Sequence, residues 1–204
     1  MIKIDEYSYS GTENLEVMAE AENYNAYLAQ LVKKQIAGAM RVVDFGAGIG
    51  TFAQPLSAAG LDIMGVEPDS GQRQRLLGKG IPCVSDISDV QDGWADVIYT
   101  VNVLEHIEDD RAILRTLYSK LKSGGKLFIY VPAFQLLYSA MDKKVGHYRR
   151  YGRAELKSKV KDAGFRITDS RYADSLGFLA SLVYKWQGND SGYSIRGARK
   201  DYDR

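Results

Sequence analysis

The run VVDFGAGIG, from Val42 to Gly50, decides the fold of this chain. It opens with a short apolar stretch, interrupted by Asp44, and continues into glycines at positions 46, 48 and 50. Glycine permits a sharp turn and lets a ligand lie against the backbone, because no Cβ is in the way. A strand that leads through such a turn into a helix predicts the first unit of a parallel sheet.

The chain on either side of this run alternates short apolar stretches with amphipathic segments, the pattern of βαβ units. Asp69 is placed to cap a helix after Pro68, and Leu114 and Leu117 belong to an apolar stripe on a later helix. The fold class is therefore α/β, with a doubly wound, mostly parallel sheet that binds ligands beyond the carboxyl ends of its strands. The strands are expected at Val42–Phe45, Ile63–Glu67, Ile81–Val84, Val97–Val101 and Leu127–Val131, with a sixth at Phe165–Thr168.

The composition narrows the class of protein. The 204 residues carry a net charge of only +1, which disfavours a nucleic-acid partner. The single cysteine, Cys83, excludes an internal disulfide and disfavours a cysteine-based zinc site. No signal peptide and no run of about 18 to 20 apolar residues is present, so we expect no membrane span and a cytoplasmic location. Nothing in the sequence indicates the oligomeric state.

Three carboxylates stand where predicted strands end: Asp44, Glu67 and Asp86. A single carboxylate at such a position is more often a solvated loop residue, and the glycines alone could form a tight strand-to-helix turn. Together they favour a ligand with an ammonium group and hydroxyls. The glycine spacing departs from the dinucleotide fingerprint G-x-G-x-x-G, because the third glycine comes one residue early. Asp44 would also repel a diphosphate, so a nicotinamide-dependent oxidoreductase is the less favoured alternative.

Four segments resemble the successive motifs of class I S-adenosylmethionine (SAM)-dependent methyltransferases. The similarity covers roughly residues 20–170, and ENYNAYL at 22–28 and GHYRRYGRAEL at 146–156 resemble a bacterial and archaeal subgroup. The resemblance implies a Rossmann-like, seven-stranded-type sheet, SAM as the cofactor, and methyl transfer to a small molecule. The four segments are VVDFGAGIG at 42–50, GVEPD at 65–69, DVIYTVNVLEHIEDD at 96–110 and LKSGGKLFIYVPAF at 121–134.

The resemblance also implies how SAM is held. Asp44 would bind the methionine ammonium, Glu67 the ribose, and Asp86 the adenine amino group. Tyr24 would close the site from the N-terminal helix, with Tyr27 beside it, although both could equally be core aromatics. The remaining cofactor residues implied by the motifs are Gly46, Gly48 and Gly50 as the backbone cradle, Ile87 at the adenine, and Asn102 and Val103 at the methionine end.

The acceptor side is expected in the segment that follows the fifth strand. Residues 141–171 hold ten basic and four acidic side chains, and they include His147, Arg149 and Arg150. Guanidinium groups bind carboxylate or phosphate, and imidazole accepts protons near neutral pH. The sequence therefore predicts an anionic acceptor bound by the two arginines, with His147 as general base. The alternative is that the arginines pair with acids such as Asp142 and that His147 orders the loop.

The adjacent pair Glu105 and His106 raises the question of a metal. Some quinone-pathway relatives have Glu-x-x-Glu-His here and bind a divalent ion, but this chain has Asn102 at the first of those positions. Adjacent residues on an α-helix also point about 100° apart. The sequence therefore predicts no metal and assigns the pair to a helix start.

The sequence thus predicts a methyltransferase that moves a methyl group from SAM to a small, anionic acceptor. A SAM-binding module without catalysis is the alternative. Residues 1–40 are expected to form an N-terminal helical cap, 41–184 the SAM-binding domain and 185–204 a polar C-terminal tail. The antiparallel final strand of the class is expected from Phe178–Tyr184, unless the sheet lacks it. The identity of the acceptor and of its methylated atom stays open.

Overall fold

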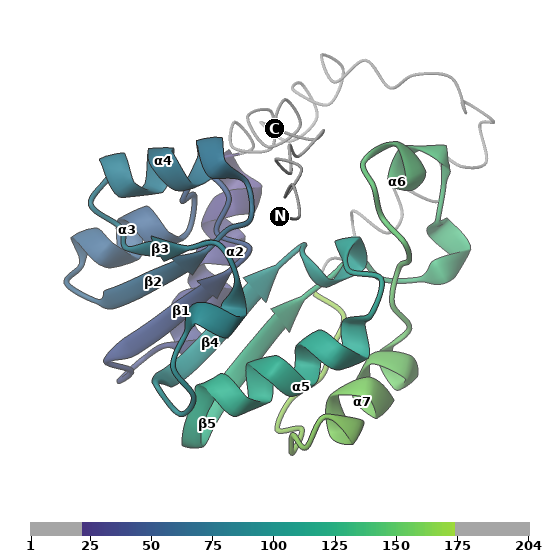
Figure 1. Ribbon diagram of the computed structural model, residues 1–204. Helices are drawn as coiled ribbons and strands as arrows, with labels where there is room; N and C mark the ends of the chain where they lie inside the picture. The colour runs from purple at the N-terminus through teal and green to yellow at the C-terminus, as the bar shows by residue number, and fades with distance from the viewer. Residues whose placement is uncertain (1–21, 174–204) are drawn as a thin grey trace, which may run out of the picture. The chain divides into compact units, whose positions relative to one another are not determined.

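The computed structural model describes residues 22–173. Its centre is a five-stranded sheet in the order β3-β2-β1-β4-β5 (Figure 1). Every pair of neighbouring strands is parallel. The chain leaves β1 towards one edge and returns at β4 to build the other, so the order reverses between β1 and β4. The strands are β1 (Arg41–Phe45), β2 (Asp62–Val66), β3 (Cys83–Val84), β4 (Ala95–Val101) and β5 (Leu121–Tyr130).

The helices begin and end at residues with clear local reasons. Asp69 caps α4, because its carboxylate accepts a hydrogen bond from the N–H of Gln72 at 2.8 Å. Ser139 and Asp142 form a reciprocal capping box on α6. The α-helices are α2 (Glu22–Gln35), α3 (Ala53–Ala58), α4 (Ser70–Gly78), α5 (Asp110–Lys120), α6 (Ala140–Lys144) and α7 (Arg153–Asp162), with 3₁₀ turns η1 (Ile87–Asp89), η2 (Leu104–His106) and η3 (Gln135–Leu137).

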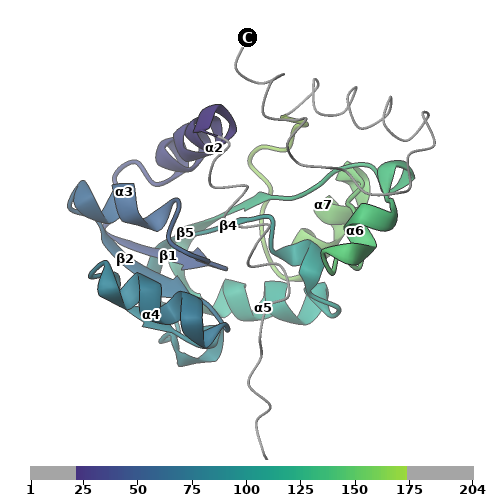
Figure 2. The same cartoon turned by 90° about the horizontal axis from the view of Figure 1, so that it is seen from above.

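One buried cluster joins the sheet to the helices that follow and precede its first strand. Val42, Ile63 and Val97 stand side by side in the parallel ladder, so they share one face of the sheet. They belong to the same cluster as Val32 of α2 and Leu56 of α3. Figure 2 shows α2 and α3 on the same side of the strands. Asp44 shares this face at the carboxyl end of β1, where ligands of such sheets bind.

The described chain divides into two compact units. The first holds the whole sheet, in residues 22–101 and 116–130. The second holds residues 102–115 and 131–173, and its buried centre is Tyr151. The Tyr151 hydroxyl donates a hydrogen bond to Asp110 at 2.9 Å, and its backbone pairs with Ala133 in a parallel bridge.

The predicted fold class is confirmed, and five of the predicted strands are present. The sixth is wrong: Phe165–Thr168 is not a strand in the structure. Its side chains alternate between half-buried and exposed as in a strand, but a ladder also needs a hydrogen-bonded neighbour, which this segment lacks among residues 22–173. The final strand expected at Phe178–Tyr184, the tail at 185–204 and the first half of the N-terminal cap lie outside the described residues. Among the residues described, no helix is long and apolar enough to cross a membrane.

Candidate functional site

The glycine turn, residues 46–50, has a backbone that only glycine adopts easily. The φ angles of Gly46, Gly48 and Gly50 are 82°, 55° and 84°, all in the left-handed region. A Cβ at Gly50 would also lie 2.8 Å from the Leu76 side chain, so any larger residue would collide with α4. The alternating glycines are therefore required by the conformation of the turn itself.

The N–H groups of the three glycines are already bonded inside the protein. Gly46 donates to the carbonyl of Val66 at 2.9 Å, and Gly50 donates to the carbonyl of Ala47 at 2.9 Å. Gly48 donates to the Glu67 carboxylate at 2.9 Å. A turn that binds a diphosphate offers such N–H groups to the ligand. This turn instead aims one of them at a carboxylate, which argues against a dinucleotide.

Asp44 is buried at the end of β1, with 3% of its surface exposed. Its Oδ2 atom has no hydrogen-bond partner in the part of the chain that the structure describes. Burial is the largest cause that raises the pKa of Asp44; the Tyr99 hydroxyl lowers it, the charge of Glu67 raises it, and the net pKa is about 7. A buried carboxylate oxygen without a donor is ready to receive a cationic group.

Glu67 joins the glycine turn to the start of α4. One carboxylate oxygen accepts from Gly48, and the other accepts from the N–H of Asp69 at 2.9 Å. Burial raises the pKa of Glu67, and the two backbone hydrogen bonds oppose that rise. Each carboxylate oxygen can accept more than one hydrogen bond, so two ribose hydroxyls can still bind. Glu67 therefore holds the turn in shape in addition to its predicted contact with SAM.

Asp86 and Tyr24 make local contacts. Asp86 is exposed and caps η1 through a 2.7 Å hydrogen bond from the N–H of Ser88, which lowers the Asp86 pKa. Ile87, the next residue, is buried. The Tyr24 hydroxyl donates to the hydroxyl of Tyr130, at the end of β5, at 3.3 Å. This contact ties α2 to the end of β5, and the role of Tyr24 as a substrate-binding residue that closes the pocket stays a prediction.

Asn102 and Val103 follow β4 directly, in the second unit. Asn102 has a φ of 54°, which is uncommon for a residue with a side chain. The backbone therefore turns sharply as it leaves the strand, as expected at a ligand-binding strand end. Their contact with the methionine end of SAM stays a prediction.

The histidine loop, residues 145–151, follows α6. It is held in place by hydrogen bonds of the His147 backbone and of the His147 ring. The His147 N–H donates to the carbonyl of Asp142 at 2.8 Å, and its carbonyl accepts from the Tyr138 hydroxyl at 2.6 Å. The ring Nδ1 lies 2.8 Å from the Asp142 carboxylate. An anionic partner fixes Nδ1 as the protonated nitrogen and leaves Nε2 as the basic one.

Arg149 and Arg150 both pair with buried carboxylates. Arg149 lies 2.7 Å from Asp110 and also donates to the carbonyl of Glu108. Arg150 binds Asp142 through Nε at 2.7 Å. Burial raises the pKa of Asp142, but the hydrogen bonds from His147 and Arg150 outweigh it and hold that pKa well below its ordinary value. These are the contacts that the alternative interpretation of the loop expects.

Two residues absent from the predicted site thus organise this unit. Asp142 accepts from His147, Arg150 and the backbone of Ser139, and Asp110 accepts from Arg149 and from Lys159 at 2.6 Å. Both carboxylates are almost fully buried. The alternative interpretation of the loop had named Asp142 as a possible partner of the arginines, whereas Asp110 was not named and the surplus of bases around 141–171 does not point to it.

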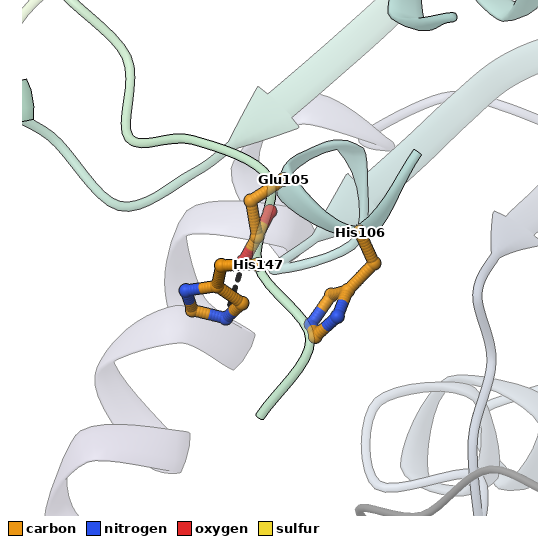
Figure 3. Close-up of side chains that lie close together, drawn as sticks. All are labelled: Glu105, His106 and His147. Carbon is orange, nitrogen blue, oxygen red and sulfur yellow. Dashed lines mark ion pairs between the residues drawn. The ribbon is translucent and has the colours of Figure 1, made fainter. Parts of the chain in front are cut away.

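The structure also brings Glu105, His106 and His147 together (Figure 3). One ligand atom from each lies within 4.8 Å of the others. Glu105 is fully buried, and burial raises its pKa to about 8. Burial, helped by the neighbouring His147, lowers the pKa of His106 to about 4. Sequence reasoning paired Glu105 with His106 alone and missed His147 as their neighbour.

Comparison with known proteins identifies the family. Residues 18–170 match a family model described as a methyltransferase domain. The chain belongs to the class I SAM-dependent methyltransferases. The predicted family and its cofactor, SAM, are thereby confirmed.

Relatives of this methyltransferase include enzymes named for quinone biosynthesis. A ubiquinone biosynthesis O-methyltransferase from Xanthomonas euvesicatoria pv. vesicatoria is 30% identical over 158 residues, which are 66% of this chain and 66% of that relative. One from Xanthomonas axonopodis pv. citri is 30% identical over 156 residues, 65% of each chain. The match therefore spans just under two thirds of the length of these relatives.

Solved structures confirm the fold of the methyltransferase. A SAM-dependent methyltransferase from Thermotoga maritima, described as a possible histamine N-methyltransferase, superposes with a TM-score of 0.66 at 24% identity, covering 77% of this chain and 79% of that one. Phosphoethanolamine N-methyltransferase 2 from Haemonchus contortus, solved with SAM, superposes with a TM-score of 0.65 at 18% identity, covering 88% of this chain and 45% of that one.

Proposed function

We propose that this methyltransferase transfers the methyl group of SAM to a hydroxyl oxygen of a small, anionic acceptor. The oxygen as acceptor atom rests on the names of the two Xanthomonas relatives. The negative charge of the acceptor rests on the arginines of the histidine loop. The two parts of the proposal are tested separately.

The observation that carries the cofactor side is the bonding of the glycine turn and Asp44. The turn's glycine N–H groups are bonded within the protein, while Asp44 offers a buried oxygen without a donor. This combination suits the ammonium of SAM and not the diphosphate of a dinucleotide. Glu67 and Asp86 stand at the next two strand ends, where a ribose and an adenine would follow.

SAM supplies an activated methyl group, so the protein needs to align the acceptor and remove its proton. His147 fits the second task, because Asp142 holds Nδ1 and leaves the Nε2 lone pair as the base. In this proposal the His147 Nε2 atom would take the proton of the acceptor O–H. SAM, held by Asp44 and Glu67, would supply the methyl group to the acceptor oxygen and leave as S-adenosylhomocysteine.

Arg150 is the better of the two candidates for the acceptor's anionic group. Its bond to Asp142 uses Nε, and a guanidinium has five N–H donors. Arg149 already uses one terminal nitrogen on Asp110 and the other on the Glu108 carbonyl. Arg150 therefore keeps more donors for a carboxylate or phosphate.

The test begins with binding and ends with transfer. SAM, but not NAD, should stabilise the protein in a thermal-shift assay. Stabilisation by NAD and not by SAM would contradict the proposed SAM-binding site. Isotope-labelled SAM is then incubated with a panel of small hydroxylated carboxylates and phosphates and with uncharged analogues. The proposal requires labelled ethers from the anionic members only. Transfer to uncharged analogues at equal rates contradicts the anionic acceptor, and no labelled ether contradicts O-methylation.

The role of His147 has its own variant. His147→Gln should lower turnover by about 10²- to 10⁴-fold, the usual contribution of a general base. SAM affinity should stay unchanged, and the loss should shrink at high pH, where the acceptor ionises without help. Lys143→Gln, an exposed change on the neighbouring helix, is the matched control. A uniform loss at every pH would assign His147 to structure alone.

A further inference from the structure

The segment between β3 and β4 is held by the end of α5. This segment contains η1, which follows Asp86 and begins with Ile87, the two residues expected at the adenine. Lys120, the last residue of α5, places its Nζ atom 2.7 Å from the Asp92 carboxylate and 3.5 Å from the carbonyl oxygen of Ser88. All of these residues belong to the first compact unit. One side chain from outside the segment thus contacts both its turn and its loop.

Lys120 is buried, with only 8% of its surface exposed. Lysine is rarely buried unless its ammonium group is paired. Its acidic partner Asp92 is exposed, with 71% of its side chain accessible, and ion pairs exposed in this way contribute little to stability. The ion pair alone therefore gives little reason for a buried lysine at this position. What the burial adds is the contact of Nζ with η1.

The carbonyl that Lys120 reaches lies near the end of η1. The two carbonyls before it, those of Asp86 and Ile87, accept N–H groups of the turn itself, each at 3.1 Å. The carbonyl of Ser88 comes next, and Lys120 donates to it, as lysine side chains do at the ends of helices. At the other end of the turn, the Asp86 carboxylate accepts from the N–H of Ser88 at 2.7 Å. The carboxylate therefore fixes the start of η1, and the lysine fixes its end.

The end of α5 is itself fixed in place. The residue after Lys120, Leu121, pairs with Ala95 in the ladder between β4 and β5. A backbone hydrogen bond of 2.9 Å also joins the residue before Lys120 to the loop that leads into β4. Leu121 and Ala95 are the first residues of their strands, whereas Asp86 comes after the carboxyl end of β3. Lys120 therefore connects the amino ends of β4 and β5 to the turn that is expected to bind adenine.

We infer that Lys120 is a positioning residue for the cofactor, which holds η1 so that Asp86 and Ile87 meet the adenine of SAM. The inference rests on the proposed contact between Asp86 and the adenine amino group. Hydrogen bonds from Ser88 are the largest cause that lowers the pKa of Asp86, and the charge of Lys120 adds to it. Even the ordinary pKa of 3.8 leaves Asp86 ionised at neutral pH. The lysine therefore determines where the carboxylate lies, and through it how well the site distinguishes adenine from other bases.

The experiment compares the affinities of the full chain for S-adenosylhomocysteine and S-inosylhomocysteine by calorimetry. The second ligand has an oxo group in place of the adenine amino group, so the ratio of the two dissociation constants measures recognition of that group. Asp86→Ala and Lys120→Met should each lower the preference for the adenosyl ligand by about three- to tenfold, the range of one hydrogen bond. The double variant should lose no more than Asp86→Ala alone, because the lysine acts through the carboxylate. Lys126→Met, the same change at an exposed lysine of β5, is the matched control.

Circular dichroism verifies the folding of each variant. If Lys120→Met does not fold, Lys120→Gln, which shortens the side chain and removes its charge, replaces it with the same expected loss. A wild-type preference in the folded lysine variant, together with a lowered preference in Asp86→Ala, overturns the inference alone. Additive losses in the double variant also overturn it, because the lysine would then act independently of the carboxylate. A wild-type preference in both single variants overturns the proposed contact of Asp86 with adenine, and the inference with it.

Discussion

The glycine turn after β1 and the histidine loop after α6 are both fixed in shape, but different groups fix them. In the turn, main-chain N–H groups bond to carbonyls and to Glu67, and the conformation demands glycine at three positions. In the loop, ring and guanidinium groups bond to two buried carboxylates, Asp110 and Asp142. A required backbone conformation restricts the residue type at that position, so it is visible in the local sequence. A side-chain ion pair can instead be made by an acid from anywhere in the chain.

The largest effect should come from breaking the histidine loop's carboxylate. Asp142→Asn leaves Arg150 and His147 without their buried counter-charge, and losing one partner of a buried pair costs about 3 to 5 kcal/mol. We expect a free energy of unfolding lower by that amount in urea titrations. Asp162→Asn, which breaks the exposed pair with Arg111, should change it by less than about 1 kcal/mol. Equal stabilities of the two variants would show that the loop is not held through Asp142.

In the glycine turn, a substitution should abolish the stabilisation by SAM. Gly48→Val places a β-branched residue at a φ of 55°, so the turn and its bond to Glu67 cannot form as they are. SAM at 100 times its dissociation constant should stabilise the wild type by about 2.7 kcal/mol, and this increment should vanish in the variant. Gly78→Val, at an exposed helical glycine with a negative φ and open space, serves as control. Unchanged SAM affinity in Gly48→Val would remove the turn from the cofactor site.

Alanine substitutions of Glu67 and Asp86 compare the contributions of the two carboxylates to SAM binding. Glu67→Ala should weaken SAM binding by about 1.5 to 3 kcal/mol for the charge-assisted bond, and by more if the turn relaxes. Asp86→Ala should cost less, because the residue is exposed and water can replace one adenine contact. Calorimetric titration with SAM compares the two. Wild-type affinity in both variants would contradict the assignment of the carboxylates to SAM.

The pH dependence of SAM binding should report on Asp44. Its pKa of about 7 lies above the ordinary value of 3.8, so ionising it destabilises the apo protein. The contribution of Asp44 to stability is therefore greatest below about pH 4 and is lost as the pH rises through about 7. SAM's ammonium needs the ionised form, so affinity should rise up to about tenfold per unit between pH 5.5 and 7. Asp44→Asn should bind weakly and without this slope, and a slope that survives in the variant belongs to another group.

The smallest effect is expected at Arg150. Arg150→Ala should raise the Michaelis constant for the acceptor several-fold, more at low salt, where charges about 10 Å apart still attract. Turnover at saturation should change little. Lys143→Ala removes a base from the same region without a predicted contact and is the control. An identical, small change in both variants would mean that general charge, and not Arg150, attracts the acceptor.

The sequence predicted the sheet well, because each strand has its own apolar run and each turn its own glycine or cap. Asp69 caps α4 as expected, and the glycines at 46, 48 and 50 all have positive φ. The prediction was wrong at Phe165–Thr168, since a strand needs a neighbour as well as a suitable composition. It also started β5 too late: pairing of Leu121 with Ala95 extends this strand back over residues that read as a helix end.

The contacts that the predicted site residues make within the protein could not be read from the sequence. Asp142, the partner of Arg150, lies in the same segment and was named as a candidate, but the pairing of Arg149 with Asp110 depends on the path of the chain between α5 and α7, which no local pattern encodes. The approach of His147 to His106 has the same origin. Glu67 was selected from its position at a strand end, and its contact with SAM stays a prediction; its bond to Gly48 was not foreseen.

The pairing of the only two imidazoles in the chain has a practical consequence for spectroscopy. A proton NMR spectrum of this protein contains just two sets of histidine C–H resonances, and both arise from rings 4.6 Å apart. Each ring lies in the other's ring-current field, so a small rotation of either shifts both signals. The unlabelled protein therefore carries a native reporter at this location, which responds to protonation of either ring and to the binding of a ligand beside them.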